Sequence, residues 1–228
     1  MEDKRRYMIK EDKGTKNEGR RCLAERLLSS VFFFCLLLSS SVSLLSCSEE
    51  NTEEGEYDNW QVKNDEMTSQ WASQANNGTY NKILTYSKDA SAQNLKSSDY
   101  IYVETLTSGS SAESPIYTDT VRVAYRGRLL PSKTYSDGYV FDQTYLKDFD
   151  WRTANVRDLA VSGLVDGFST ALMNMHRGDR WCVRIPYQLG YGSVAQGSSV
   201  PAYSNLVFDI VLQDFWHPGE VKGKFKTR

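Results

Sequence analysis

Leu189-Gly190-Tyr191-Gly192 and, further along the chain, Leu206-Val207-Phe208-Asp209-Ile210 are the two stretches that decide the fold. The first places a tyrosine between glycines, which is typical of a turn. The second alternates apolar side chains, which is typical of a strand with one buried face. A tyrosine in such a turn is a poor core residue. We therefore expect Tyr191 to face a ligand, with Phe208 on the strand behind it.

Three further motifs precede these two. They are Val121-Arg122-Val123-Ala124-Tyr125-Arg126-Gly127, Phe141-Asp142 and Val161-Ser162-Gly163-Leu164-Val165-Asp166-Gly167. Taken in order, the motifs resemble the FKBP-type peptidyl-prolyl cis-trans isomerases over roughly residues 99–215. A series of motifs in one order is far more specific than any single motif. The resemblance implies an α+β fold, in which a curved antiparallel β-sheet wraps around one short α-helix.

The resemblance also implies the residues of the site. The expected catalytic residues are Tyr125, Phe141, Asp142, Val161, Tyr191 and Phe208, and the expected substrate-binding residues are Leu164, Val200 and Trp151. The hydroxyl of Tyr191 and the backbone N–H of Val161 are expected to donate hydrogen bonds to substrate carbonyls. Asp142 is expected to orient neighbouring groups.

The chain departs from the family pattern in several places, among them the following. Leu164 stands where the family usually has a tryptophan at the pocket floor, which predicts a deeper and less well shaped pocket. Phe149 and Trp151 resemble the family's aromatic pair, although they lie slightly too far from Val161 in the sequence. Val200 matches an apolar position on the loop that covers the pocket.

The implied reaction is rotation about an Xaa-Pro peptide bond, with proline-containing polypeptides as substrates. Its barrier of about 18–20 kcal/mol comes from amide resonance. An apolar pocket favours the twisted, less polar form of the amide, so differential binding is enough for catalysis. We therefore expect no cofactor and no metal, and His176 and His217 do not lie at metal-ligand spacing.

Two other functions remain open at this point. In the first, the pocket with Leu164 at its floor has lost catalysis and holds proline-containing segments as a chaperone does. Alternatively, the domain is a spacer and the N-terminal helices take part in an envelope assembly. The remainder of the chain after residue 47 is acidic and has no basic patch, so we expect no nucleic-acid partner.

Periodicity predicts the elements around these motifs. Strands are expected near residues 100–106, 121–125, 180–185 and 206–212. A helix capped by Ser162 is expected to end before Gly178, with the apolar stripe Leu164, Phe168, Ala171, Leu172 and Met175. An N-terminal helix starting after Asp58 or Asn59 is indicated by Trp60, Asn64, Met67, Trp71 and Ala75, and a second short helix by Tyr80, Ile83 and Leu84. These two helices are a candidate homodimer surface.

The N-terminus resembles a secretory signal followed by a bacterial lipobox. Basic residues precede an apolar segment that ends in Leu44-Leu45-Ser46-Cys47, which makes Cys47 the expected lipidated residue. An uncleaved membrane anchor over residues 27–47 is the alternative. The acidic stretch Ser48-Glu49-Glu50-Asn51 resembles the surface-export tag of Bacteroidetes lipoproteins, or is a plain solvated tether. The expected location is the cell envelope, with a lipid anchor in the outer membrane.

The domain boundaries follow from these assignments. We expect a signal peptide and lipobox over residues 1–47, a flexible tether over 48–56, a helical extension over 57–95, the isomerase domain over 96–216 and a C-terminal tail over 217–228. Only Cys182 lies beyond Cys47, and one cysteine cannot form a disulfide within the folded part. We therefore expect a free thiol at Cys182.

Overall fold

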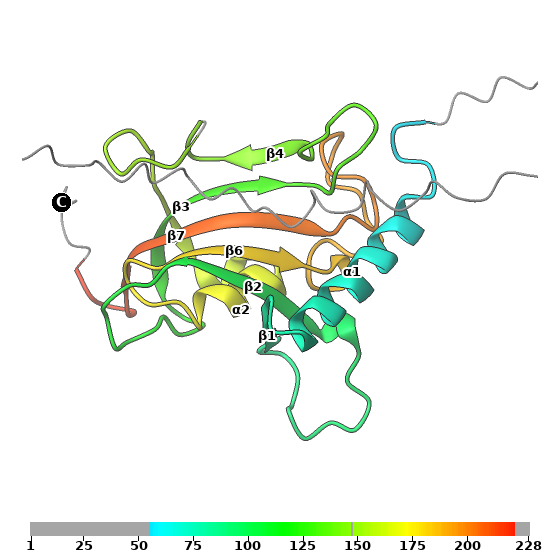
Figure 1. Cartoon of the computed structure of the whole chain (residues 1–228). Coiled ribbons are helices and arrows are strands. Elements are labelled where there is room, and N and C mark those ends of the chain that lie inside the picture. The colour runs from blue at the N-terminus through cyan, green and yellow to red at the C-terminus, as the bar shows by residue number, and fades with distance from the viewer. Residues whose placement is uncertain (1–54, 147, 222–228) are drawn as a thin grey trace, which may run out of the picture. The chain divides into compact units, whose positions relative to one another are not determined.

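The computed structural model describes residues 55–146 and 148–221 (Figure 1). Its elements, in chain order, are α1 (Trp60–Asn76), β1 (Asn81–Leu84), η1 (Ser97–Asp99), β2 (Tyr100–Thr107), β3 (Thr120–Arg128), β4 (Val140–Gln143), β5 (Arg157–Ala160), η2 (Val161–Gly163), α2 (Asp166–Leu172), β6 (Arg180–Ile185), η3 (Tyr187–Leu189) and β7 (Leu206–Trp216). Among these described residues, no helix has the length and apolar character needed to cross a bilayer.

The strands form one antiparallel sheet in the order β1-β2-β6-β7-β3-β4, with β5 also paired to β3. The long strand β7 lies at the centre and pairs with β6 on one side and β3 on the other. Figure 1 shows α2 against one face of the curved sheet, where it contacts β2 and β6. The expectation of an α+β fold with a curved antiparallel sheet around a short helix is confirmed.

The core lies between α2 and the sheet. Its fully buried side chains come from the apolar faces predicted for the strands and for the helix; they include Val121, Val123, Leu172, Met175, Val183 and Ile210. Gly167 lets the helix approach closely, because a Cβ at this position would lie 2.3 Å from Cγ2 of Ile185 on β6. This close contact holds the first turn of α2 against the sheet.

The helix α2 is shorter than the periodicity predicts. It begins at Asp166, and Ser162 lies before it in the η2 turn, so Ser162 does not cap the helix. It ends at Leu172, and His176 lies beyond it in a turn in which its N–H donates to the carboxylate of Asp179 at 2.7 Å. Turns before and after α2 therefore replace the additional helical residues that the periodicity predicts.

The expected second short helix at Tyr80, Ile83 and Leu84 is wrong. Residues Asn81–Leu84 form β1, which pairs with β2 in the register Asn81 to Val103 and Leu84 to Tyr100. A segment of only four residues has no strong local preference, so pairing with an available sheet edge decides its conformation. The helical extension thus supplies the edge strand of the sheet.

The expected N-terminal helix is confirmed as α1, although its start differs in detail. Asn59 occupies the cap position with a left-handed φ of 54° and makes no side-chain cap bond. The side chain of Asp58 instead accepts a hydrogen bond from the N–H of Gly55 at 2.7 Å. The buried face of α1 consists of Trp60, Asn64, Thr68 and Trp71, and the helix contacts β1 and β2 of the same chain.

Cys182 is fully buried on β6 and is disulfide-bonded, so the expectation of a free thiol there is wrong. No other cysteine lies within the described residues. The expected lipidation site Cys47, the signal over residues 1–47 and nearly all of the tether over 48–56 also lie outside them. The same holds for most of the predicted C-terminal tail.

A hydrogen bond that depends on pH lies just beyond the end of β7, between His217 and Asp119. The Nδ1 of His217 lies 2.8 Å from Oδ1 of Asp119, a fully buried residue that also accepts the N–H of Ile116. The hydrogen bond and the charge of Asp119 raise the pKa of His217 above 6.5. The folded state therefore binds a proton on His217 more tightly than the unfolded chain does.

This contact predicts that stability falls as the pH rises. The contribution of His217 is complete below its unfolded pKa and is lost as the pH passes the raised folded pKa. The melting temperature of the wild-type protein should therefore fall between about pH 6 and about pH 8 by more than that of His217→Gln, which has no titrating ring. If the melting temperature, measured by circular dichroism, falls equally in both proteins, then protonation of His217 does not stabilise the folded state.

Candidate active site

Four aromatic rings from four elements meet on one side of the sheet. Phe208 on β7 lies at their centre, with ring-centroid distances of 4.9 Å to Phe168, 5.5 Å to Phe141 and 6.3 Å to Tyr125. Each of these pairs is edge-to-face, the arrangement that aromatic quadrupoles favour. The result is an apolar wall built from β3, β4, α2 and β7.

Gly127 makes room for these rings. A Cβ at this position of β3 would lie 2.5 Å from Cε1 of Phe208 and 2.7 Å from Cζ of Phe141. Real Cβ atoms do not approach other carbon atoms so closely, so any larger residue forces one ring aside. The glycine that ends the Val121–Gly127 motif is therefore explained by packing.

The polar edge of the site is a three-residue network. The Tyr125 hydroxyl donates to Oδ2 of Asp142 at 2.5 Å. Arg157 on β5 donates to the Tyr125 hydroxyl at 2.7 Å and to Oδ2 of Asp142 at 3.2 Å. Burial and the bond to Asp142 raise the pKa of Tyr125, so its hydroxyl stays protonated at neutral pH. Two neighbours thus fix the orientation of the Tyr125 ring.

Tyr191 lies beside this network, on the loop between η3 and β7. Burial and, second, the nearby charge of Asp142 raise the pKa of Tyr191. Its hydroxyl makes no hydrogen bond to any other described residue, which leaves a protonated donor available. Val200, on the same loop, is buried and exchanges backbone hydrogen bonds with Gln196.

For two expected site positions, the structure differs from the sequence motif. The Val161 N–H donates to the carbonyl of Asp119 at 3.0 Å, and its side chain is fully buried, so this N–H is not available to a substrate. Leu164 lies before α2, and Phe168 supplies the helical ring of the aromatic wall. Phe168, and not Leu164, therefore supplies the helical ring that packs on Phe208, and the expectation that the Val161 N–H is available to a substrate is wrong.

Val165 takes the place expected for Val161. It is the residue immediately before α2, and its carbonyl accepts hydrogen bonds from Phe168 and Ser169. Its own N–H has no acceptor among the described residues. A backbone donor without an acceptor among the described residues therefore lies just before the helix that carries Phe168, four positions later than the sequence motif indicated.

Trp151 does not join the aromatic wall. It contacts Phe149 at a centroid distance of 4.9 Å, and Phe149 packs against a cluster formed by Ala124, Tyr145 and Val211. Side chains alternate along β3, so Ala124 faces away from Tyr125. The expected aromatic pair therefore lies on the opposite face of the sheet.

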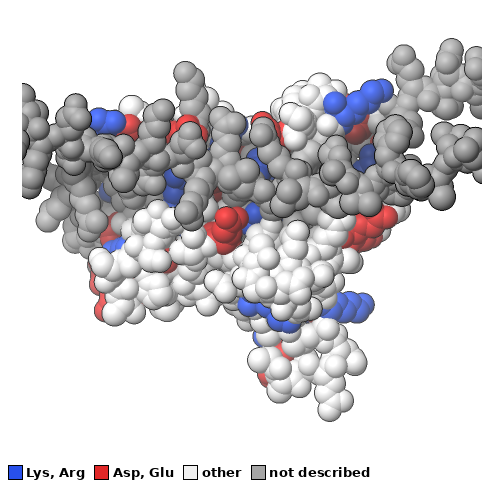
Figure 2. All heavy atoms as spheres, in the orientation of Figure 1, with Lys and Arg blue, Asp and Glu red and all other residues white. Residues whose placement is uncertain are grey.

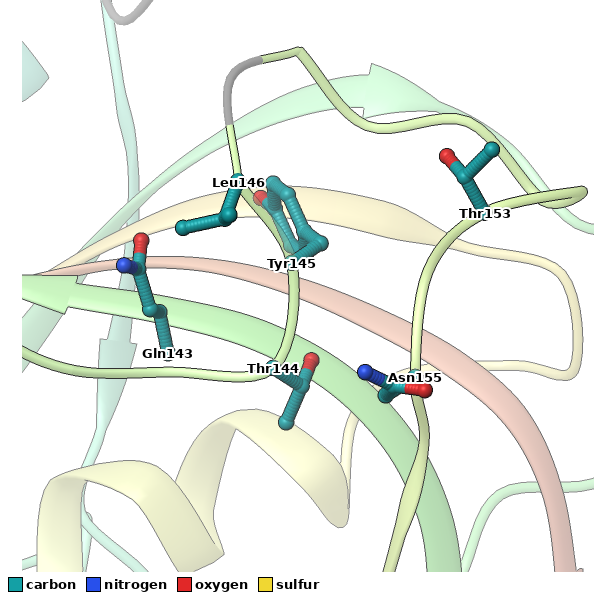
Figure 3. Close-up of a pocket in the computed structure, with 6 residues that line it drawn as sticks. All are labelled: Gln143, Thr144, Tyr145, Leu146, Thr153 and Asn155. Atoms are coloured by element: carbon teal, nitrogen blue, oxygen red, sulfur yellow. The ribbon is translucent and has the colours of Figure 1, made fainter.

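A separate hollow lies beside that opposite-face cluster. Figure 3 shows the side chains that line it, which come from the end of β4 and from the connection to β5: Gln143, Thr144, Tyr145, Leu146, Thr153 and Asn155. Its volume is about 460 Å³. None of the four wall rings lines it. Tyr125, Phe141 and Phe208, from which the sequence predicts a site, therefore do not line this hollow.

The charges of the described surface fit a site of this apolar kind. Figure 2 shows acidic and basic side chains interspersed on the visible described face, without an extended basic area. The described residues hold no group of three or more His, Cys, Asp or Glu side chains placed to bind a metal ion. The arrangement offers an apolar wall and hydrogen-bond donors, which suit binding of an uncharged planar group.

Gly127 provides a test of the aromatic packing. Gly127→Ala should lower the free energy of unfolding by about 1–3 kcal/mol, because the new methyl group displaces Phe208 or Phe141. Gly163→Ala is the matched control, since a Cβ there meets nothing within 4 Å. Its effect should stay within about 0.5 kcal/mol. Urea unfolding measures both variants, and equal stabilities would show that Gly127 is not needed for packing.

Comparisons with known proteins agree with this geometry. Residues 111–213 match the family model of the FKBP-type peptidyl-prolyl cis-trans isomerases. The FKBP-type 22 kDa peptidyl-prolyl cis-trans isomerase of Escherichia coli K12 is 36% identical over 98 residues, which are 43% of this chain and 42% of that protein. A macrophage infectivity potentiator of Trypanosoma cruzi is 30% identical over 131 residues, which are 58% of this chain and 61% of that protein.

A solved structure of a peptidyl-prolyl cis-trans isomerase from Pseudomonas syringae pv. tomato is 22% identical, covers 71% of this chain and 97% of its own, and has a TM-score of 0.49. The matches to the two curated relatives span 42% and 61% of those proteins' lengths. The family model and these curated relatives show that residues 111–213 are similar to the FKBP-type peptidyl-prolyl cis-trans isomerases.

Proposed function

We propose that the protein is a peptidyl-prolyl cis-trans isomerase that acts on proline-containing polypeptides. The observation that carries the proposal is the aromatic wall around Phe208, with two unengaged donors, the hydroxyl of Tyr191 and the N–H of Val165, on neighbouring segments. A proline ring is apolar and the carbonyls beside it are hydrogen-bond acceptors. Both parts of the substrate therefore have a complementary surface.

The wall favours the transition state over the ground state. A planar amide is polarised by resonance, and this polarity falls when the bond twists. Transfer into the ring-lined site therefore costs the planar form more than the twisted form, which lowers the barrier. Without a catalyst the rotation takes tens of seconds at 25 °C. No covalent intermediate and no cofactor is needed for this step.

The two donors hold the peptide while its bond rotates. Tyr191 donates its hydroxyl to one substrate carbonyl, and the N–H of Val165 donates to another. Asp142 and Arg157 keep the Tyr125 ring in place, since both bond to its hydroxyl. Val200 contributes a buried apolar side chain to the loop that carries Tyr191. These residues position the substrate and leave the rotation itself to the apolar wall.

The chaperone alternative loses its main argument. It rested on Leu164 as a small pocket floor, whereas Phe168 provides an aromatic ring at this place, 4.9 Å from Phe208. Aromatic floors give a flat face on which a proline ring packs. Catalysis is therefore the better supported function, and holding of proline segments follows from the same pocket.

Turnover of a short proline peptide tests the proposal and the assignment of the floor together. The purified chain should accelerate cis-trans exchange of the peptide, measured by NMR exchange spectroscopy. Phe168→Leu should lower kcat/KM about tenfold, because the lost ring removes packing to the twisted proline. Leu164→Ala is the matched control and should change kcat/KM by less than about twofold.

Each result has a definite meaning, provided that thermal melts show both variants to be folded. If the wild-type protein fails to accelerate exchange, the catalytic proposal is wrong. If Leu164→Ala lowers turnover and Phe168→Leu does not, the floor lies where the sequence motif placed it. Phe168→Trp carries the family's usual ring at the floor and should retain or raise turnover.

We further propose that the mature protein is a lipoprotein of the cell envelope that assists folding of exported proteins. The Leu44-Leu45-Ser46-Cys47 ending of an apolar segment supports lipidation at Cys47, and the acidic residues that follow support exposure at a membrane surface. The outer membrane is the expected location. In the envelope-assembly alternative, removal of residues 57–95 would abolish partner binding.

Mass spectrometry tests the anchor. Protein purified from membranes should begin at Cys47 and carry a diacylglyceryl-sized addition on this residue. Because cleavage removes Cys22 and Cys35 and the lipid occupies the sulfur of Cys47, Cys182 should be reduced in this mature form, and a disulfide from Cys182 to Cys47 would refute the proposal. Cys47→Ser is the matched control, because it removes only the sulfur that accepts the lipid, and this variant should remain unlipidated. An unmodified Cys47 with residues 1–46 still attached would refute the lipoprotein proposal and favour the uncleaved anchor.

A further inference from the structure

The loop that carries Tyr191 and Val200 runs from η3 to β7 and is held from outside the family domain. Its last residues, Ser204 and Asn205, are buried although both are polar. Their hydrogen-bond partners include residues of α1, more than a hundred positions earlier in the sequence. Buried polar groups are stable only when they are paired, so α1 is part of what fixes this end of the loop.

Asn205 is the centre of these contacts. Its N–H donates to Oδ1 of Asn64 at 2.7 Å, and its Nδ2 donates to the carbonyl of Asn64 at 2.7 Å and to the hydroxyl of Thr68 at 3.0 Å. Its Oδ1 accepts the N–H of Tyr187 at 2.8 Å, at the other end of the loop. One side chain therefore joins both ends of the loop to α1.

Asn64 is equally constrained. It is completely buried, and its Nδ2 donates to the carbonyl of Trp60 at 2.6 Å. Trp60 in turn donates its indole N–H to the hydroxyl of Ser204 at 2.8 Å. Removing either side chain would leave a buried partner without its hydrogen bond, which is the costly case for a polar contact.

The loop itself has a strained backbone next to this contact. Tyr203 has a φ of 61°, in the left-handed region that residues other than glycine rarely adopt. It precedes Ser204, and its N–H donates at 2.9 Å to the carbonyl of Gly192, which adjoins Tyr191. Strained conformations persist only where the surroundings hold them. The contact with α1 is therefore linked, through Tyr203, to the position of Tyr191.

A second part of the helical extension, residues 85–87, contacts α2, the helix that carries Phe168 of the aromatic wall. Thr85 is buried and lies 3.2 Å, hydroxyl to hydroxyl, from Thr170 of α2, and the N–H of Tyr86 donates to the same Thr170 hydroxyl. The hydroxyl of Ser87 donates to Asp166, the first residue of α2. The extension thus contacts both elements that flank Val165 and Tyr191.

We propose that Asn64 and Trp60 of α1 are positioning residues that hold the Tyr191 loop in its substrate-binding conformation. The inference deepens the proposed isomerase function and rests on it. These residues act through Asn205 and Ser204 and do not touch the substrate. The helical extension is then a component of the active site, and the match to the family model, which starts at residue 111, omits it.

The test combines turnover with local hydrogen exchange in the full chain. Asn64→Ala should lower kcat/KM on the order of tenfold, the change in loop docking expected from one lost buried hydrogen bond. Trp60→Phe removes the indole N–H that bonds to Ser204 and leaves a smaller ring in the same buried position, and it should lower kcat/KM about threefold. Amides of residues 190–203 should exchange faster in both variants, while those of β6 and β7 keep the wild-type rate.

Ser69→Ala is the matched control. Ser69 is an exposed residue of α1 whose hydroxyl bonds only to the carbonyl of Asp65 in the same helix, so turnover and exchange should not change. Wild-type turnover and loop exchange in a folded Asn64→Ala variant would overturn the proposal. So would faster exchange spread evenly over the whole sheet, since this indicates a merely structural role. If Asn64→Ala does not fold, Trp60→Phe decides by the same criteria.

The hydrogen-exchange measurement also distinguishes failure of the positioning role of α1 from failure of the proposed isomerase function. If the wild-type chain has no isomerase activity, the proposed function fails. Faster exchange confined to residues 190–203 would still show that α1 holds the loop. If the wild-type chain is active and the loop is unaffected by both substitutions, only the positioning role of α1 is refuted.

Discussion

The contact of the Phe208 ring with three other rings is the interaction on which the rest of the structure depends. Its three partners come from β3, β4 and α2, so one side chain brings four elements to the same place. The contact is possible only because Gly127 has no Cβ in the space that Phe208 and Phe141 fill. The same rings form the packed interior and the wall of the site, and at this end of the sheet stability and binding therefore draw on one set of contacts.

Much of this arrangement was predictable from the sequence, because the residues concerned lie on strands with a clear alternation. Tyr125, Phe141 and Phe208 are brought together as expected, and Asp142 lies beside them. The register of the helix was not predictable. Val161-Ser162-Gly163-Leu164 and Val165-Asp166-Gly167-Phe168 are two similar segments in tandem, and either fits the motif. The choice is made by a distant group, the Asp119 carbonyl, which engages the N–H of Val161.

Other parts of the site depend on contacts that no local pattern reveals. Arg157 reaches Tyr125 only because β5 pairs with β3, and nothing in its own neighbourhood singles it out. Asn64 falls on the stripe of the N-terminal helix, yet periodicity does not distinguish a buried amide from a buried apolar residue. Likewise, Asn81–Leu84 becomes a strand through pairing with β2. In each case tertiary contacts override a weak local preference.

The central place of β7 has a consequence for the order in which the molecule can fold. β3 and β6 do not pair with each other, since β7 lies between them and is the last strand of the sheet to be synthesised. Until β7 arrives, both neighbours present unpaired edges that attract other strands. Pairings between segments so far apart in the chain also close slowly. In a nascent chain that ends at β6, the edges of β3 and β6 are thus still unpaired. The sheet is completed late, after residues 206–216 have been translated.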